Sequence, residues 1–157
     1  MKIVFLVIGK TSERWIEDGM NVFLKRLKYY QRTEFHALPE VKGGGKMTAE
    51  ALKEAEAAVY EKFLEPTDTV VLLDENGKGY HSRGFAEQIQ KWRNAGPKRL
   101  VFIVGGAYGF APSMYERTNA KLSMSKMTTS HQLIRVIFLE QLYRAMTILR
   151  GEPYHND

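Results

Sequence analysis

VFIVGGAYGF, residues 101–110, is a strand-like apolar run that ends in small residues. The same pattern returns in KLSMSKMTTSH (121–131), and a long apolar stretch with a polar end follows in QLIRVIFLEQLYRAMTILRGEPYHND (132–157). Small residues directly after the strands of an α/β chain mark places where the backbone comes close to a ligand. We therefore expect the binding site in the last third of the chain, with the earlier residues serving mainly as scaffold.

The rest of the chain alternates short apolar runs with longer amphipathic ones. Strands that alternate with helices predict the α/β class, with a mostly parallel sheet flanked by helices on both faces. The length fits one domain, residues 1–157. ENGKG (75–79) is predicted as a turn in which Asn76 and Gly77 take positive φ. We expect strands near 2–8, 33–38, 69–74, 99–104 and 121–125, and helices near 12–30, 48–64, 83–95, 112–119 and from about 130 onward.

Composition narrows the possible chemistry. The chain has no cysteine, which excludes disulfides and thiolate catalysis, and its four scattered histidines lack the spacing of a zinc or iron site, so we expect no metal. The apolar run at residues 1–9 is too short to span a membrane and has no cleavage site, so we expect a cytoplasmic protein without a membrane partner. A net charge of +5 permits an anionic partner such as RNA.

Glycine-rich stretches invite comparison with nucleotide-binding motifs, and the comparison fails. In EVKGGGKMT (40–48) the first glycine of a phosphate-binding loop would fall on Glu40, and Met47 replaces the required Ser or Thr. GGAYG (105–109) lacks the spacing of a dinucleotide-binding loop. A Ser125–His131 hydrolase is disfavoured because the chain has no G-x-S-x-G elbow.

The long final helix is apolar over much of its surface. On a helical wheel one apolar arc spans about half the circumference, and Val136, Ile137 and Tyr143 extend it. Such a helix is buried on more than one side, and a second copy of the chain is the neighbour we expect, giving a homodimer. The alternative is a central helix in a monomer. The arc comprises Ile134, Phe138, Leu139, Leu142, Ala145, Met146, Ile148 and Leu149.

Two arginines of this helix differ in their expected surroundings. Arg135 falls near the middle of the apolar arc, where a charge requires a partner, a ligand or a subunit boundary. Arg144 lies on the polar side, four residues after Glu140. Its side chain is interpreted either as half of a surface ion pair or as a functional group near the tail.

The tail after this helix carries groups suited to a nucleic-acid base. Gly151 stops the helix, Pro153 stiffens the chain, and Tyr154 with His155 can stack on a base or move a proton. His131 has a simpler interpretation. With Thr129 or Ser130 as helix N-cap, it lies in the first helical turn and serves a structural role.

Four motifs in order carry a family resemblance: VGGAYGF (104–110), SMSKMTTSH (123–131), RVIFLEQLYRA (135–145) and RGEPYH (150–155). With them the whole chain resembles the small SPOUT-class methyltransferases that methylate N3 of a pseudouridine in bacterial large-subunit (23S) ribosomal RNA. This resemblance implies an α/β fold with a C-terminal trefoil knot, and S-adenosyl-L-methionine bound in the knot loops at a homodimer interface. Carried onto this chain, the cofactor contacts are Leu73, Gly105, Met124, Ser125, Lys126, Met127, Thr128 and Thr129.

The resemblance also directs the choice of catalytic residues and substrate. We expect Arg144 to stabilise the base or its phosphate, and Tyr154 and His155, from the same or the other subunit, to position the base or accept its proton. The short chain has no added RNA-binding domain, which favours ribosomal RNA within an assembled ribosome as the substrate. Two alternatives stay open: a non-enzymatic ribosome-binding or assembly factor, and a SPOUT methyltransferase that acts on tRNA.

Overall fold

Five parallel strands and five helices alternate along residues 1–157, all of which the computed structural model describes. The strands are β1 (Lys2–Ile8), β2 (Thr33–Leu38), β3 (Thr69–Gly79), β4 (Arg99–Val104) and β5 (Ala120–Ser123). The helices are α1 (Arg14–Leu27), α2 (Ala49–Phe63), α3 (Ser82–Asn94), α4 (Pro112–Arg117) and α5 (Leu133–Leu149), and a short 3-10 helix, η1, covers Gly44–Lys46. The predicted α/β class with a parallel sheet is confirmed.

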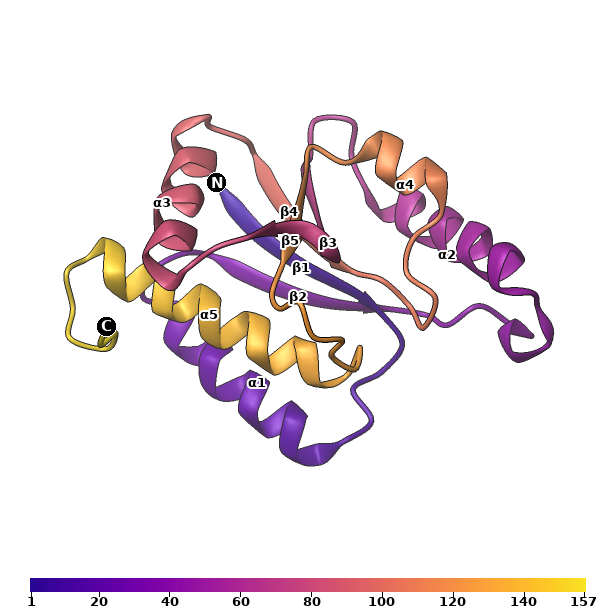
Figure 1. The fold of residues 1–157 in the computed structure, drawn as a ribbon, viewed down its shortest axis with the longest axis horizontal. Coiled ribbons are helices and arrows are strands. Elements are labelled where there is room, and N and C mark those ends of the chain that lie inside the picture. The colour runs from indigo at the N-terminus through magenta and orange to yellow at the C-terminus, as the bar shows by residue number, and fades with distance from the viewer.

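The sheet has the order β2-β1-β4-β3-β5 and separates two helical layers. Alternate strand residues face opposite sides: Phe5 and Phe102 belong to the core beneath α1, α3 and α5, whereas Leu6 and Ile103 belong to the core beneath α2 and α4. Figure 1 shows α2 and α4 away from the other three helices. Strands buried on both faces explain why β1 and β4 are apolar without interruption.

The predicted turn at ENGKG is wrong, because these residues belong to β3. No residue other than glycine has positive φ, and Gly77 is not among the positive-φ glycines. The register shifts between Leu73 and Lys78, after which Lys78 pairs with Leu122 of β5. A Cβ on Gly77 would lie 2.7 Å from the backbone nitrogen of Leu122. Glycine is needed here for this close approach, and pairing with β5 outweighs the local turn preference.

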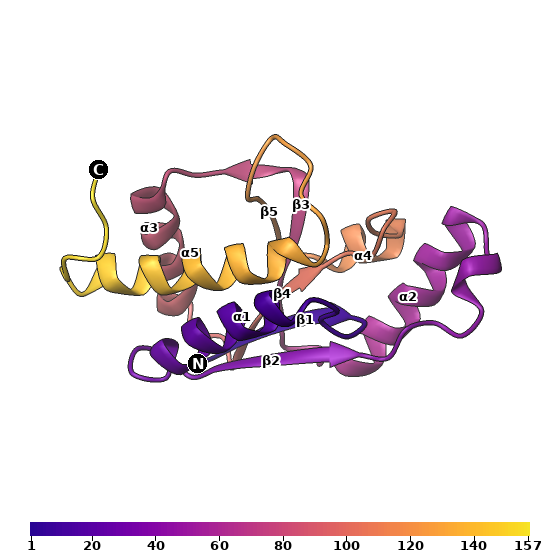
Figure 2. The same ribbon diagram turned by 90° about the horizontal axis from the view of Figure 1, so that it is seen from below.

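Helix α5 is surrounded by elements of its own chain. It packs against α1 and α3, and Phe138 contacts the rings of both Phe5 and Phe102. At the crossing with α1, a Cβ on Gly19 would lie 3.0 Å from Val136. Figure 2 shows α1 and α5 side by side. The burial that suggested a second copy is therefore accounted for within one chain, and the homodimer needs other support.

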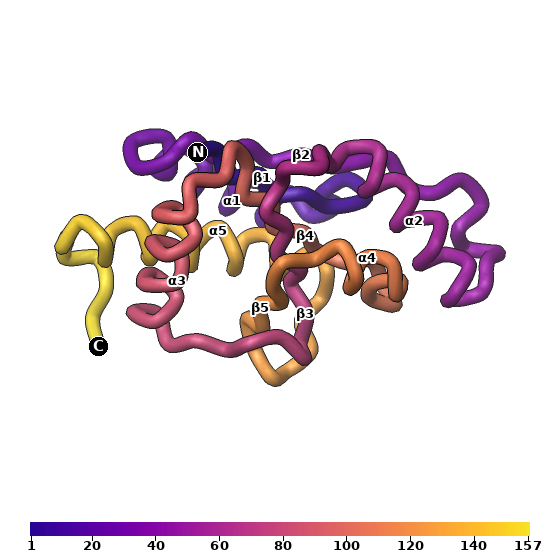
Figure 3. The backbone as a smooth tube through the Cα atoms, turned by 90° about the horizontal axis from the view of Figure 1, so that it is seen from above, coloured from indigo at the N-terminus to yellow at the C-terminus, as the bar shows by residue number.

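The two ends of the molecule differ in what they carry. Figure 3 shows α3 and the C-terminal tail at one end and α2 at the other.

None of the helices combines the length and apolar character that crossing a membrane requires. The trefoil knot stays a prediction.

Arg135 finds its partner inside the chain, at the carboxyl end of β1. Its side chain is 1% exposed. Nη1 donates to the carbonyl of Gly9 and to Oγ1 of Thr11, both at 3.0 Å, and Nη2 donates to the carbonyl of Ile8 at 3.1 Å. Nε donates to the carbonyl of His131 at 3.1 Å. Burial lowers the pKa of Arg135, and these four bonds hold the charged form in place.

Replacement of Arg135 tests how much its hydrogen bonds contribute to the stability of the fold. We expect Arg135→Met to lower the free energy of unfolding by about 2–4 kcal/mol, because it leaves several carbonyl oxygens without a donor. Urea denaturation followed by circular dichroism measures the change. Arg14→Met, at an exposed position of α1, is the matched control and should change stability by less than about 0.5 kcal/mol. Equal effects of the two substitutions would contradict this role.

Candidate functional site

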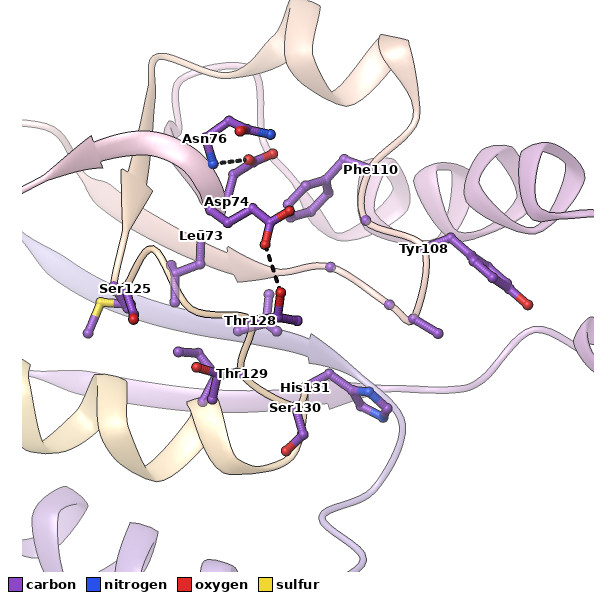
Figure 4. Close-up of a pocket in the computed structure, with 18 of the residues that line it drawn as sticks. Leu73, Asp74, Asn76, Tyr108, Phe110, Ser125, Thr128, Thr129, Ser130 and His131 are labelled. Carbon is purple, nitrogen blue, oxygen red and sulfur yellow. Dashed lines mark hydrogen bonds between the residues drawn. The ribbon is translucent and has the colours of Figure 1, made fainter.

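A cavity of about 580 Å³ opens at the carboxyl ends of β3, β4 and β5. Three segments form its wall: residues 73–76 after the first part of β3, residues 104–110 after β4, and most of residues 124–131 before α5. Tyr115 and Ile134 complete it. Figure 4 shows side chains from these segments converging on one space. The volume is ordinary for a small-molecule site, and the carboxyl edge of a parallel sheet is where such sites occur.

A tight turn after β4 forms the second segment. Gly106 and Gly109 pair as an isolated antiparallel bridge, and Gly109 has φ of 83°. A Cβ on Gly105 would lie 3.2 Å from the carbonyl carbon of Gly109, so a larger residue would open the turn. Beneath it, the hydroxyl of Tyr60 in α2 donates to the carbonyl of Val104 at 2.7 Å. The turn thus presents backbone to the cavity from a fixed support.

The third segment is ordered by its own hydroxyl groups. Ser123 Oγ donates to the carbonyl of Ser125, and Ser125 Oγ accepts from the amide of Met127, both at 3.0 Å. Ser130 Oγ accepts from the amide of Leu133 at 3.0 Å. This last bond closes the turn that leads into α5, but the N-cap itself is Gln132, so the prediction of Thr129 or Ser130 as N-cap is wrong by two to three residues. A loop held in this way can offer backbone amides and carbonyls to a ligand.

The rim of the cavity is acidic. Asp74 Oδ1 accepts from the amide of Asn76 at 2.8 Å, and its other oxygen accepts from the hydroxyl of Tyr115. Burial, together with this bond, raises the pKa of Tyr115 to about 12. Thr128 donates to Glu75 at 3.2 Å across the opening (Figure 4). No lysine or arginine lines the cavity, so its charge favours a cationic ligand over an anionic one.

The structure brings together most of the residues assigned to the cofactor from the sequence. Lys126 alone is absent from the cavity wall. Sequence reasoning missed Asp74 and Tyr115, and it gave His131 a purely structural role although this residue lines the cavity. The acidic pair after the third strand was the available signal for Asp74; nothing local marked Tyr115. The assigned residues that line the cavity are Leu73, Gly105, Met124, Ser125, Met127, Thr128 and Thr129.

The three predicted catalytic residues gather elsewhere, around Glu140 in the middle of α5. Arg144 Nε donates to Glu140 Oε1 at 3.1 Å, which confirms the predicted pair. Tyr154 donates to the same oxygen at 3.1 Å, and the Arg144 guanidinium lies 4.7 Å from the centre of the Tyr154 ring. Burial raises the pKa of Tyr154, and its bond to Glu140 adds to the effect. We call Glu140, Arg144, Tyr154 and His155 the tail cluster.

The His155 ring lies between Arg144 and Asp157. Its Nδ1 lies 3.3 Å from Nη1 of Arg144, which can only donate, so Nδ1 accepts. The proton then lies on Nε2, which donates to Asp157 Oδ1 at 2.9 Å. Asp157 in turn accepts from Arg83 of α3 at 2.8 Å, and this bond together with His155 lowers its pKa. The tail is thereby fixed against α3.

Aromatic rings and arginines continue the tail cluster toward α1. Arg26 lies 5.4 Å from the centre of the Tyr143 ring, and Arg150 lies 4.2 Å from that of Tyr30. The hydroxyl of Tyr30 donates to Glu152, which raises the pKa of Tyr30 to about 12. Stacked rings beside guanidinium groups are typical of surfaces that bind nucleic-acid bases and phosphates.

The cavity and the tail cluster lie at opposite ends of α5. Ile134 borders the cavity and Arg144 belongs to the tail cluster, ten residues or about 15 Å further along the helix axis. Figure 2 shows the tail beyond the end of α5 that points away from α4. One base cannot contact both groups of residues within a single chain.

The fold and the cavity define an α/β protein that binds a small ligand in backbone loops at the carboxyl edge of a parallel sheet. A family model described as "Predicted SPOUT methyltransferase" matches residues 1–155. The chain therefore belongs to the SPOUT methyltransferase family.

Full-length relatives narrow the comparison. The "Ribosomal RNA large subunit methyltransferase H" of Phocaeicola vulgatus is 46% identical, and that of Parabacteroides distasonis 45%, each over 100% of both chains. The protein of the same name from Christiangramia forsetii is 44% identical over 99% of both. A solved SAM-bound methyltransferase from Legionella pneumophila shares 12% identity and a TM-score of 0.45 over 92% of this chain and 66% of that chain, too remote a similarity to support a conclusion.

The tail cluster can be tested without any ligand. We expect Glu140→Gln to speed amide exchange at residues 152–156, because it weakens the bonds that Arg144 and Tyr154 make to this carboxylate. Hydrogen–deuterium exchange with mass spectrometry measures it. Stability should fall by less than about 1 kcal/mol, since the pair is partly exposed. Unchanged exchange in the tail would show that other contacts hold it.

Proposed function

We propose that this protein transfers a methyl group from S-adenosyl-L-methionine to N3 of a pseudouridine in large-subunit ribosomal RNA. The observation that carries the proposal is its full-length identity of 46% with a ribosomal RNA large subunit methyltransferase. The family resemblance of the motifs supplies the finer target, the N3 atom of pseudouridine in 23S rRNA. On this proposal residues 1–157 act as one methyltransferase domain.

The cavity suits this methyl donor. Leu73, Phe110 and Ile134 give it an apolar wall for the adenine ring. The turn after β4 and the loop 124–129 offer backbone groups that can read the polar edge of adenine. The acidic rim favours the positive sulfonium. Bound there, the donor would supply an activated methyl group, and no metal is required.

The tail cluster suits the other half of the reaction. Methylation of N3 requires that this nitrogen be aligned with the methyl group and lose its imide proton. Arg144 is placed to stabilise negative charge on the base or on its phosphate. Tyr154 and His155 would position the base, and His155 would accept its proton once RNA displaces one of the partners of the ring.

A homodimer resolves the separation of the two sites. With two copies arranged in opposite directions, the tail cluster of one subunit would face the cavity of its partner. Helix α1 and the turn after it, beside α5, leave Trp15, Val22 and Tyr29 exposed at 62%, 44% and 80%, spaced by seven residues. This spacing puts Trp15 and Val22 on one face of α1, with Tyr29 just beyond its end, and a second copy would cover this apolar surface.

An assembled ribosome or its large subunit is the substrate state we propose, as the family resemblance of the motifs implies. The aromatic and arginine-rich surface around Tyr143 and Arg150 would contact the rRNA beside the target base. A ribosomal substrate implies a cytoplasmic location.

Mass spectrometry tests the reaction directly. Ribosomes from a strain lacking the gene, incubated with the purified protein and S-adenosyl-L-methionine, should gain one methyl group on a pseudouridine of large-subunit rRNA. Deletion of residues 153–157 should reduce this gain at least 100-fold while donor binding persists. Methylation of tRNA instead would identify a different SPOUT activity, and ribosome binding without methyl transfer would identify an assembly factor.

Mixing two inactive variants tests the shared site. Gly105→Val blocks the cavity, because even a Cβ would crowd Gly109, and Arg144→Ala disables the tail cluster. After unfolding and refolding together, half of the dimers would be mixed, and each would hold one intact site. Activity should therefore recover to about a quarter of that of the native protein. If cavity and tail cluster act within one chain, the mixture stays inactive.

A further inference from the structure

A buried carboxyl group lies behind the cavity and has no assigned role. Glu56 occupies the inner face of α2 and is 5% exposed. Its Oε1 has no hydrogen-bond partner, and no ion pair involves the residue. An unpaired buried carboxylate is costly, so its position calls for an explanation beyond packing.

Glu56 faces the turn that forms the wall of the cavity. A Cβ on Gly106 would lie 2.2 Å from Glu56 Oε2 and 2.8 Å from Oε1, so the carboxyl group rests against the Cα of this glycine. Gly106 lines the cavity, and Glu56 does not. The carboxyl group is therefore separated from the ligand space by the thickness of one backbone segment, and glycine at position 106 permits this approach.

No positively charged group in the cavity wall pairs with this carboxylate. The charged residues of the wall are Asp74 and Glu75, both acidic. In a poorly hydrated interior, a charge acts over a longer distance than it does in water. Burial raises the pKa of Glu56, and a cation in the cavity would draw it back toward the ionised form.

We propose that the Glu56 carboxylate, together with the acidic rim, makes this cavity prefer the cationic methyl donor over the neutral product. This inference rests on the proposed function, in which S-adenosyl-L-methionine is the donor. The donor carries a positive sulfonium, and S-adenosylhomocysteine carries a neutral thioether of nearly the same shape. Apolar and hydrogen-bonding contacts treat the two alike, whereas a fixed negative charge does not. Glu56 thus strengthens donor binding and leaves product binding unchanged, without touching the ligand.

The proposal predicts a dependence on pH that belongs to the donor alone. Because the cation favours ionised Glu56, donor affinity should rise as the pH rises through the raised pKa, while product affinity stays level. Other titratable or charged groups near this wall contribute their own changes, which are the same in the native protein and in a Glu56 variant. They are Tyr60 beside Glu56 on α2, Asp74 and Glu75 on β3, and His131 and Arg135 near the start of α5.

Isothermal titration calorimetry with the two ligands tests this inference. Glu56→Gln keeps the shape of the side chain and removes its charge. We expect it to weaken S-adenosyl-L-methionine binding roughly 5–30-fold and to change S-adenosylhomocysteine binding by less than about twofold. Glu54→Gln, an exposed position on the same helix, is the matched control and should alter neither. If the glutamine variant fails to fold, Glu56→Met provides the same comparison.

The outcomes of these titrations distinguish the role of Glu56 from the proposed function. An equal effect of Glu56→Gln on both ligands, or no effect on either, overturns the charge role and leaves the proposed function standing. A native protein that binds neither ligand overturns the proposed function itself. A donor-to-product affinity ratio that stays constant with pH in the native protein also contradicts the role of Glu56.

Discussion

All five strands run in the same direction, and the site depends on this constraint. Because they are parallel, the ends of β3, β4 and β5 open at one edge, where their loops can enclose a ligand without any single loop being long. The buried guanidinium of Arg135 fixes the start of α5 to the end of β1 at that same edge. The last helix therefore begins where the cavity needs its wall, and it carries the tail to the far end of the molecule.

Local pattern was enough to predict the strands and helices, because the apolar runs of β1 and β4 are buried on both faces and most helices carry one apolar side. It failed at residues 75–79, where the sequence prefers a turn and pairing with β5 imposes a strand. For α5 it indicated extensive burial but did not identify the neighbours. An apolar circumference does not say whose side chains cover it, and α1 and α3 do so here.

The same limit applies to the site. Glycines and small hydroxyl residues after strands marked the cavity in the sequence. Loops whose backbone must face a ligand are rich in such residues, so the signal is visible in composition. Tyr115 and Glu56 left none, because each acts through a contact made by the fold: Tyr115 with Asp74, and Glu56 with Gly106. The distance between the cavity and the tail cluster, in contrast, could have been predicted, because Ile134 and Arg144 lie ten residues apart on one helix.

The order of strands also bears on how the chain acquires its structure. Lys2 of β1 pairs with Arg99 of β4, and the ring of Phe5 meets that of Phe138. These contacts join residues that are synthesised far apart in time. Strand β1 therefore cannot pair with β4 until most of the chain has been made. Long-range parallel pairing of this kind slows folding. The core should close only after synthesis is nearly complete, when α5 arrives and covers the apolar face of the sheet.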